Sequence, residues 1–140
     1  MAKFSSPDVI FKFDIADGGS LTDITTYITK IGDINITRPL VESTPFGTST
    51  AEWLVSIFKK YEPITIGGFF DDTASSGPDA VFNIGRYVHA VTRSYEITLG
   101  TRKLSGEAWI VSYKRMFTSG EYTQWEAEIQ STGTVTEATV

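Results

Sequence analysis

Few residues in this sequence have the types and spacing that chemistry would need. His89 is the single histidine and no cysteine is present, which excludes a histidine-based triad, a multi-histidine metal site and a disulfide framework within one chain. Glu126 and Glu128 share one face of an expected strand, about 6.5–7 Å apart, a spacing that overlaps the paired carboxylates of some glycosidases. Nothing near them in the sequence would raise the pKa of one above the other. We interpret them as a solvated strand face, and predict no catalytic residue, no cofactor and no enzyme activity.

Acidic residues also gather around two loops, and carboxylates on loops can bind calcium. One group surrounds the glycine pair at 18–19, and the other follows a strand expected at 64–70. The six residues are Asp14, Asp17, Asp23, Asp71, Asp72 and Asp79. Because neither spacing matches the EF-hand loop, we favour solvated acidic loops and predict no metal site.

The three tryptophans are further candidates for recognition, because aromatic rings can form a sugar-binding platform or anchor an interface. Trp109 and Trp125 fall on the apolar faces of expected strands, which predicts that both pack in the core. Trp53 lies beside a loop and stays open as an interface anchor.

Composition and charge limit the class of protein further. The chain has 140 residues, 41% of them apolar and 13% aromatic, which predicts one folded domain over residues 1–140. The net charge of −5 argues against a protein that grips nucleic acid, since such proteins usually present a basic face to phosphate. No segment approaches the ~20 apolar residues of a membrane span, and residues 1–7 show no signal-peptide pattern. We expect a protein of a cytoplasm, or of an assembly made there.

Periodicity predicts a mainly β (α+β) domain. Alternating apolar residues predict strands at about 8–15, 27–37, 64–70, 94–99, 104–117 and 121–131. Turns at Gly100 and at Ser119–Gly120 join the last three, which therefore form an antiparallel meander. In the final strand the residues expected to face the core are Trp125, Ala127 and Ile129.

Between these strands the sequence predicts two short helices, a loop and a tail. Helical spacing after a capping box predicts a helix at about 50–60. Pro78 in a first turn predicts another helix at 77–85. Prolines mark a long loop at about 38–60 that contains the first helix. The Thr-rich stretch from about 132 has no helical period and predicts a loose C-terminal tail.

Four segments, taken in order, carry a resemblance to a known family. They are Asp23–Ile31 (DITTYITKI), Ser43–Gly47 (STPFG), Ile64–Thr73 (ITIGGFFDDT) with Gly77–Phe82 (GPDAVF), and a closing stretch of Val111–Arg115, Gly120–Thr123 and Trp125–Val135. Together they resemble phage tail tube proteins, also called major tail proteins. Each motif is short, but their order and spacing over most of the chain are specific. Residues 53–60 depart from the family, which more often has a polar loop there.

The resemblance implies an antiparallel β-sandwich or half-barrel with a short flanking helix. It also implies a structural virion protein that self-assembles into hexameric rings, which stack into the tail tube through which DNA passes. Its partners would be other copies of itself and tail proteins such as the tape measure and the terminator. Assembly would take place in the host cytoplasm, without a membrane.

Two surfaces are candidates for this role. A ring needs a heterologous interface whose rotation closes, and Phe46, Trp53 and Phe58 in the long loop are the proposed assembly residues. Glu126 and Glu128 are the proposed acidic face of the lumen, where carboxylates would repel passing DNA. The face of residues 8–14 competes for that position.

Two other interpretations stay open. A type VI secretion tube subunit or a tail terminator would be a related tube or ring component, and would differ in whether the subunit polymerises or stops at one ring. A carbohydrate-binding β-sandwich would need an exposed aromatic platform, for which Trp53 is the candidate.

Overall fold

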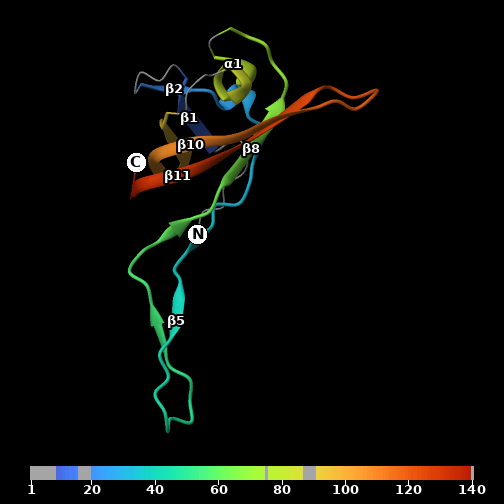
Figure 1. Cartoon of the computed structure of the whole chain (residues 1–140). Coiled ribbons are helices and arrows are strands. Elements are labelled where there is room, and N and C mark those ends of the chain that lie inside the picture. The colour runs from blue at the N-terminus through green and yellow to red at the C-terminus, as the bar shows by residue number, and fades with distance from the viewer. Residues whose placement is uncertain (1–8, 16–19, 75, 87–90, 140) are drawn as a thin grey trace.

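The computed structural model describes residues 9–15, 20–74, 76–86 and 91–139. Most of them form strands around one short helix (Figure 1). The strands are β1 (Val9–Asp14), β2 (Leu21–Asp23), β3 (Lys30–Ile31), β4 (Ile36–Thr37), β5 (Leu40–Glu42), β6 (Trp53–Val55), β7 (Lys60–Tyr61), β8 (Ile64–Phe69), β9 (Arg93–Leu99), β10 (Arg102–Met116) and β11 (Gln124–Thr139). The helix is α1 (Pro78–Phe82), and the 3₁₀ turns are η2 (Thr25–Tyr27) and η3 (Ile84–Arg86).

Seven strands form one antiparallel sheet in the order β2-β1-β9-β10-β11-β8-β3. The predicted meander of the last three strands is confirmed as β9, β10 and β11. The sheet curls on itself, because Val9 and Phe11 of β1 line the same pocket as Ile31 of β3, from near opposite ends of the strand order. This curled sheet with its flanking helix confirms the predicted mainly β, half-barrel class of fold.

The core lies on the concave side of the sheet, where alternating apolar side chains face inward. Trp125, Ala127 and Ile129 are fully buried there, as predicted from their spacing. Helix α1 covers this side and begins with a proline in its first turn, as expected. Its Phe82 ring lies 4.9 Å from the Phe13 ring and 5.1 Å from the Trp125 ring, measured between centroids. The helix is shorter than the predicted 77–85, since η3 replaces its last turn.

The prediction that Trp109 packs in the core is wrong. Trp109 is 40% exposed and Val111 is 50% exposed, whereas Ala108 on the opposite side of β10 is fully buried. The ladder between β10 and β11 is irregular between Ile110 and Ser112. This bulge reverses the alternation, so Tyr113 packs against the core on the side of Ala108 and not on that of Trp109.

The predicted loose tail from about 132 is also wrong, because β11 continues to Thr139 and pairs with Arg102 at the far end of β10. The register shifts by two residues opposite Gly106, where Gly133 adopts a left-handed φ of 71°. Glycine adopts this conformation without steric cost. The bulge explains why a Thr-rich segment with an internal glycine is still a strand.

The predicted helix at about 50–60 is wrong as well. Trp53–Val55 forms β6, which pairs with β5 through Leu40↔Val55 and Glu42↔Trp53. A helix in water needs a partner for its apolar face, and this segment reaches no core. Its β-branched and aromatic residues instead favour strand.

The predicted strand at 27–37 is divided. Tyr27 belongs to η2, then β3 joins the main sheet, and β4 joins a separate ribbon with β7. The division falls at Gly32, whose backbone N donates to the Thr65 carbonyl oxygen at 2.6 Å. After this contact the chain leaves the sheet.

Candidate assembly surfaces

Residues 34–62 form a long two-stranded arm that extends away from the body of the protein (Figure 1). Its root is the β4–β7 ribbon and its distal part is the β5–β6 ribbon. Between the ribbons the Ser56 N donates to the Pro39 carbonyl oxygen at 2.9 Å, and beyond β5 the Ser43 N donates to the Glu52 carbonyl oxygen at 2.9 Å. The predicted long loop is therefore a hydrogen-bonded hairpin with a defined direction.

The arm exposes large apolar side chains that contribute nothing to the core. All three residues proposed for assembly lie on it: Phe46 is fully exposed at the tip, Phe58 is 75% exposed and Trp53 is 57% exposed. Other exposed apolar residues of the arm are Ile34, Ile36, Leu40, Val41, Leu54, Val55 and Ile57. Contiguous apolar surface of this extent usually marks an interaction site.

The arm is fixed to the sheet at both of its roots. On the returning strand, Gln130 Nε2 of β11 donates to the Tyr61 carbonyl oxygen at 2.8 Å, and the Tyr61 ring packs against the core. On the leading side, Lys30 Nζ of β3 donates to Glu126 Oε2 of β11 at 2.7 Å. Side chains of β11 thus contact both β3, which precedes the arm, and the returning strand of the arm.

Glu126 and Glu128 lie on the outer face of the sheet, opposite the core. Glu126 is held between two lysines, at 2.7 Å from Lys30 and 3.6 Å from Lys114. The hydrogen bond from Lys30 is the main reason why the pKa of Glu126 is lowered. Glu128 pairs across the strands with Ser112 and Thr65, and is half-buried. The two carboxylates are brought onto one face, as predicted, but that face also carries cations.

The competing face of residues 8–14 offers fewer carboxylates. Asp8 lies outside the described residues, and Asp14 is buried. Lys12 points outward and is registered between Asp23 of β2 and Glu96 of β9. This face is a row of mixed charges.

Within the described ranges, the acidic residues of the two loops do not come together at a site that could bind a metal ion. No three described histidine, cysteine or acidic residues form a group that could hold a metal ion. Asp79 turns to the sheet, where its Oδ1 accepts hydrogen bonds from Arg115 Nη2 at 2.6 Å and from the Tyr113 hydroxyl at 3.1 Å. Asp71 accepts from the backbone N of Thr73 at 2.8 Å. Two further candidates, His89 and Asp17, lie outside the described residues.

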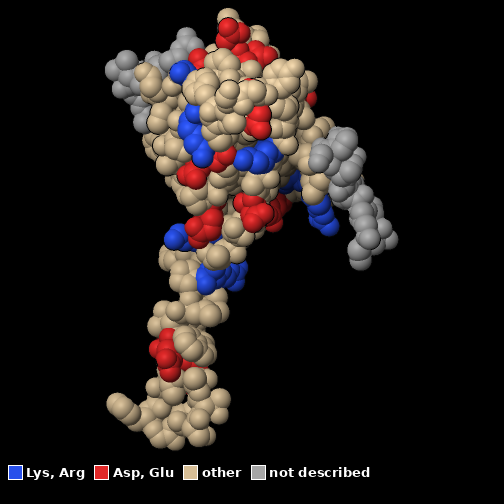
Figure 2. Space-filling model, turned by 90° about the vertical axis from the view of Figure 1, so that its right-hand side faces the viewer, with Lys and Arg blue, Asp and Glu red and all other residues tan. Residues whose placement is uncertain are grey.

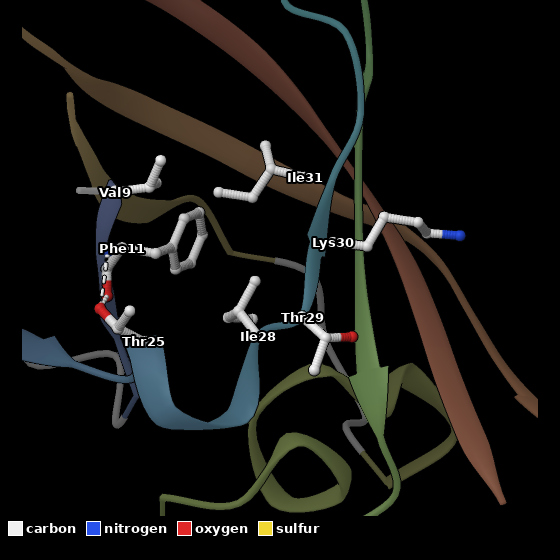
Figure 3. Close-up of a pocket in the computed structure, with 7 residues that line it drawn as sticks. All are labelled: Val9, Phe11, Thr25, Ile28, Thr29, Lys30 and Ile31. Atoms are coloured by element: carbon white, nitrogen blue, oxygen red, sulfur yellow. Dashed lines mark hydrogen bonds between the residues drawn. The ribbon is translucent and has the colours of Figure 1, made fainter. Parts of the chain in front are cut away.

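A pocket of about 180 Å³ opens between β1 and β3 (Figure 3). The Thr25 hydroxyl of this pocket is already engaged, since it accepts a hydrogen bond from the Phe11 backbone N at 2.9 Å. The lining residues are Val9, Phe11, Thr25, Ile28, Thr29, Lys30 and Ile31. The pocket is therefore lined mainly by apolar side chains and does not bring reacting groups together.

A second apolar cluster, missed in the sequence, lies at the turn between β10 and β11. Phe117 and Tyr122 are largely exposed there. The Tyr122 ring meets the exposed Phe69 ring edge-on at a centroid distance of 6.0 Å. The available signal was an aromatic residue on each side of the Ser119–Gly120 turn, where solvated turns usually carry polar residues.

Neither a family model nor a curated protein sequence matches this chain. Solved structures do share its fold. A chain of the anti-feeding prophage baseplate, determined with six-fold symmetry, matches with a TM-score of 0.80 at 11% identity, over 98% of this chain and 95% of that chain. A chain from the tail of an empty gene transfer agent particle with C6 symmetry matches with a TM-score of 0.74 at 16% identity, over 96% and 98%.

A third chain, from the cap that terminates the tube of the anti-feeding prophage, matches with a TM-score of 0.63 at 14% identity, over 100% of this chain and 93% of that chain. The described residues include no helix with the length and apolar character needed to cross a membrane. The class that the fold defines is thus the β-rich, tail-tube-like fold of such particles. The matches span nearly the whole of each chain, so the likeness includes the arm as well as the sheet.

Proposed function

We propose that this chain is a structural, non-enzymatic subunit of a phage tail or a related particle. Copies assemble into hexameric rings, and the rings stack into a tube through which DNA passes. The observation that carries the proposal is the apolar arm of residues 34–62, on a fold shared end to end with components of six-fold particles. The subunit is assembled in the host cytoplasm and resides in the virion tail.

The arm supports assembly because its exposed surface has no function within one subunit. Obligate interfaces usually bury about 2,000 Å² or more. Phe46, Trp53 and Phe58 project from a hydrogen-bonded hairpin, where a neighbouring copy can receive them. A heterologous contact of this kind repeats around a ring until it closes.

The outer face of the sheet is proposed to line the lumen. Glu126 and Glu128 face outward there beside Trp109 and Lys114. Because Glu126 is paired with lysines, this lining is close to neutral locally and offers DNA no continuous basic track. The passing DNA would contact it without being held. The tape measure and the terminator are the further partners of such a tube.

A single-ring component is the second candidate. Two of the structural matches are a baseplate chain and a tube-terminating cap chain, and neither function requires unlimited stacking. A type VI secretion tube subunit would be a third related component. These alternatives differ from a tail tube subunit in the length and composition of the assembly.

Electron microscopy of the purified, concentrated protein tests the proposal. We expect long tubes; single rings would favour the baseplate or cap alternative. A monomer under all conditions, including with its tail partners, would contradict the proposal.

Arm variants test the assembly residues. The triple variant Phe46→Ser, Trp53→Ser, Phe58→Ser should keep the far-ultraviolet circular dichroism of the fold and lose assembly. Thr48→Ala with Thr50→Ala, two exposed polar positions of the same arm, serves as the matched control and should assemble. Assembly of the triple variant at the wild-type level would exclude the arm from the interface.

A further inference from the structure

Exposed groups of opposite charge lie at opposite ends of the body, one at its top and one where the arm leaves it. Asp71 and Asp72 occupy the loop between β8 and α1, at the end of the body farthest from the arm (Figure 1). We call this pair the acidic crown. Arg38, Lys59 and Lys60 lie at the β4–β7 ribbon where the arm leaves the body, and we call them the basic collar. Figure 2 shows acidic groups at the top of the body and a mixture of basic and acidic groups at the arm root.

The basic collar has no acidic partner among the described residues. Thr37 pairs with Lys60, which places Arg38 beside Lys59 on the neighbouring strand. All three cations are exposed, and like charges facing each other across strands destabilise a ribbon. Asp33, Glu42 and Glu62 lie within five residues of them in sequence, but none of the three forms an ion pair with the collar. An isolated subunit gains nothing from this arrangement.

The acidic crown likewise has no basic partner among the described residues, and its Asp71 is half-buried. Asp72 is exposed, and no hydrogen bond or ion pair joins it to a described residue. Asp71 accepts hydrogen bonds from the hydroxyl and the backbone N of Thr73, which lower the pKa of its carboxyl and keep it charged at neutral pH. The crown therefore presents two fixed negative charges to whatever meets that end.

The distal arm is almost free of charge. Between Glu42 and Glu52 the sequence STPFGTSTA carries no ionisable side chain. About ten residues per strand of the hairpin extend roughly 30 Å. An arm of that length can pass along the flank of a neighbouring body while its root meets the end of that body.

We infer that a second copy of this chain docks end to end, with the basic collar of one copy on the acidic crown of the next. This inference rests on the proposed function and names the contact between successive rings. Like ends repel and unlike ends attract, so the charges set one direction for the whole stack. Because exposed charges are screened within about 10 Å at 0.1 M salt, stacking weakens as salt rises.

A charge swap tests the docking in the full-length protein. Crown reversal (Asp71→Lys with Asp72→Lys) places positive charge against the collar, and collar reversal (Lys59→Glu with Lys60→Glu) places negative charge against the crown. Each should reduce the sedimented tube fraction by about tenfold or more, since like-charge contacts across an interface cost several kcal/mol. Rings should persist on electron microscopy grids. The variant that carries both reversals should recover tubes.

Two controls keep the result interpretable. Asp72→Lys alone alters an exposed residue without a described partner, so its fold should be unchanged even if replacing Asp71 disturbs the loop. Glu121→Lys makes the same charge change at the exposed turn between β10 and β11, and should leave stacking intact.

The outcomes separate the two proposals. Single reversals that form tubes with the wild-type yield and salt dependence would overturn the docking and leave the proposed function standing. Failure of the double reversal to recover tubes, while it still folds and forms rings, would also overturn it. A wild-type protein that forms neither rings nor tubes would overturn the proposed function, and the docking with it.

Discussion

The ammonium group of Lys30 lies 2.7 Å from a carboxylate oxygen of Glu126, although the two residues belong to strands that are not neighbours. Strand β8 lies between them, and Gly67 is the residue of β8 registered with both. Because Gly67 has no side chain, the long side chain of Lys30 can cross β8 to reach Glu126. The strand that leads into the arm is therefore tied to the centre of the sheet.

A double-mutant cycle should measure a modest coupling between Lys30 and Glu126. Lys30 is 55% exposed, so solvent screens the pair and we expect a coupling of about 0.2–1 kcal/mol in urea unfolding. The variants are Lys30→Met, Glu126→Gln and both together. Glu128→Gln is the matched control on the same face, since Glu128 forms no ion pair with a described residue. A Lys30–Glu126 coupling no larger than the coupling between Lys30 and Glu128 would contradict a stabilising ion pair between Lys30 and Glu126.

The contribution of Asp79 to stability should depend on pH. Burial alone would raise the pKa of Asp79, but the hydrogen bonds from Arg115 and Tyr113 outweigh it and lower the pKa below 3.8. A lowered folded-state pKa stabilises the fold above the unfolded value, and this gain is lost as pH falls through the folded value. Asp79→Asn should therefore melt a few degrees below wild type at neutral pH.

The two melting curves should converge as pH falls below 3.8 and the carboxyl of Asp79 is protonated in both folded and unfolded chains. Circular dichroism melts over this range provide the measurement. Asp72→Asn, on the exposed loop, is the control and should follow wild type at every pH. If the melting temperatures of Asp79→Asn and wild type differed by the same amount down to strong acid, the packing of the Asp79 side chain, and not its charge, would hold α1 on the sheet.

Gly68 should tolerate no side chain. A Cβ at this position would lie well inside van der Waals contact of the Tyr27 carbonyl oxygen and 3.3 Å from Trp125 Nε1. Both neighbours are fixed, one by the backbone and one by ring stacking against Phe82. We expect Gly68→Ala to destabilise the fold by about 1–3 kcal/mol in urea unfolding.

Thr65→Ala on the same strand is the control for this steric argument, because the side chain of Thr65 is half-buried on the outer face. Thr65→Ala should lower the free energy of unfolding by less than Gly68→Ala does. Equal costs would mean that strand propensity, and not the contact with Tyr27, decides the effect.

The sheet was predictable from sequence where burial and alternation agree. Trp125, Ala127 and Ile129 alternate with polar residues, and all three are fully buried. On β10 the alternation is broken by the bulge near Val111, which no local pattern marks. The alternation therefore predicts the wrong side for Trp109, although it predicts the strand itself.

The arm was not predictable as a hairpin because its apolar residues pack against no core within the described part of the chain. Trp53, Leu54 and Ile57 have a helical spacing, and a helix would follow if a core were there to cover that face. In the structure these residues remain exposed. Likewise the partner of Glu126 is Lys30, which lies 96 positions away. Such pairs depend on strand order, which single-sequence patterns do not specify.

Burial of the arm on assembly should be visible in tryptophan fluorescence. Trp125 is fully buried and Trp53 is 57% exposed, so the Trp109→Phe variant has one accessible tryptophan, on the arm. Assembly should shift its emission to shorter wavelength and lower acrylamide quenching several-fold, because packing against a neighbour excludes water and quencher. Trp53→Phe is the matched variant and reports Trp109 on the outer face. If that face lines a wide lumen, acrylamide should still reach it in the assembled state. Unchanged quenching of Trp53 in assembled material would mean that the arm stays in solvent and that another surface joins the copies.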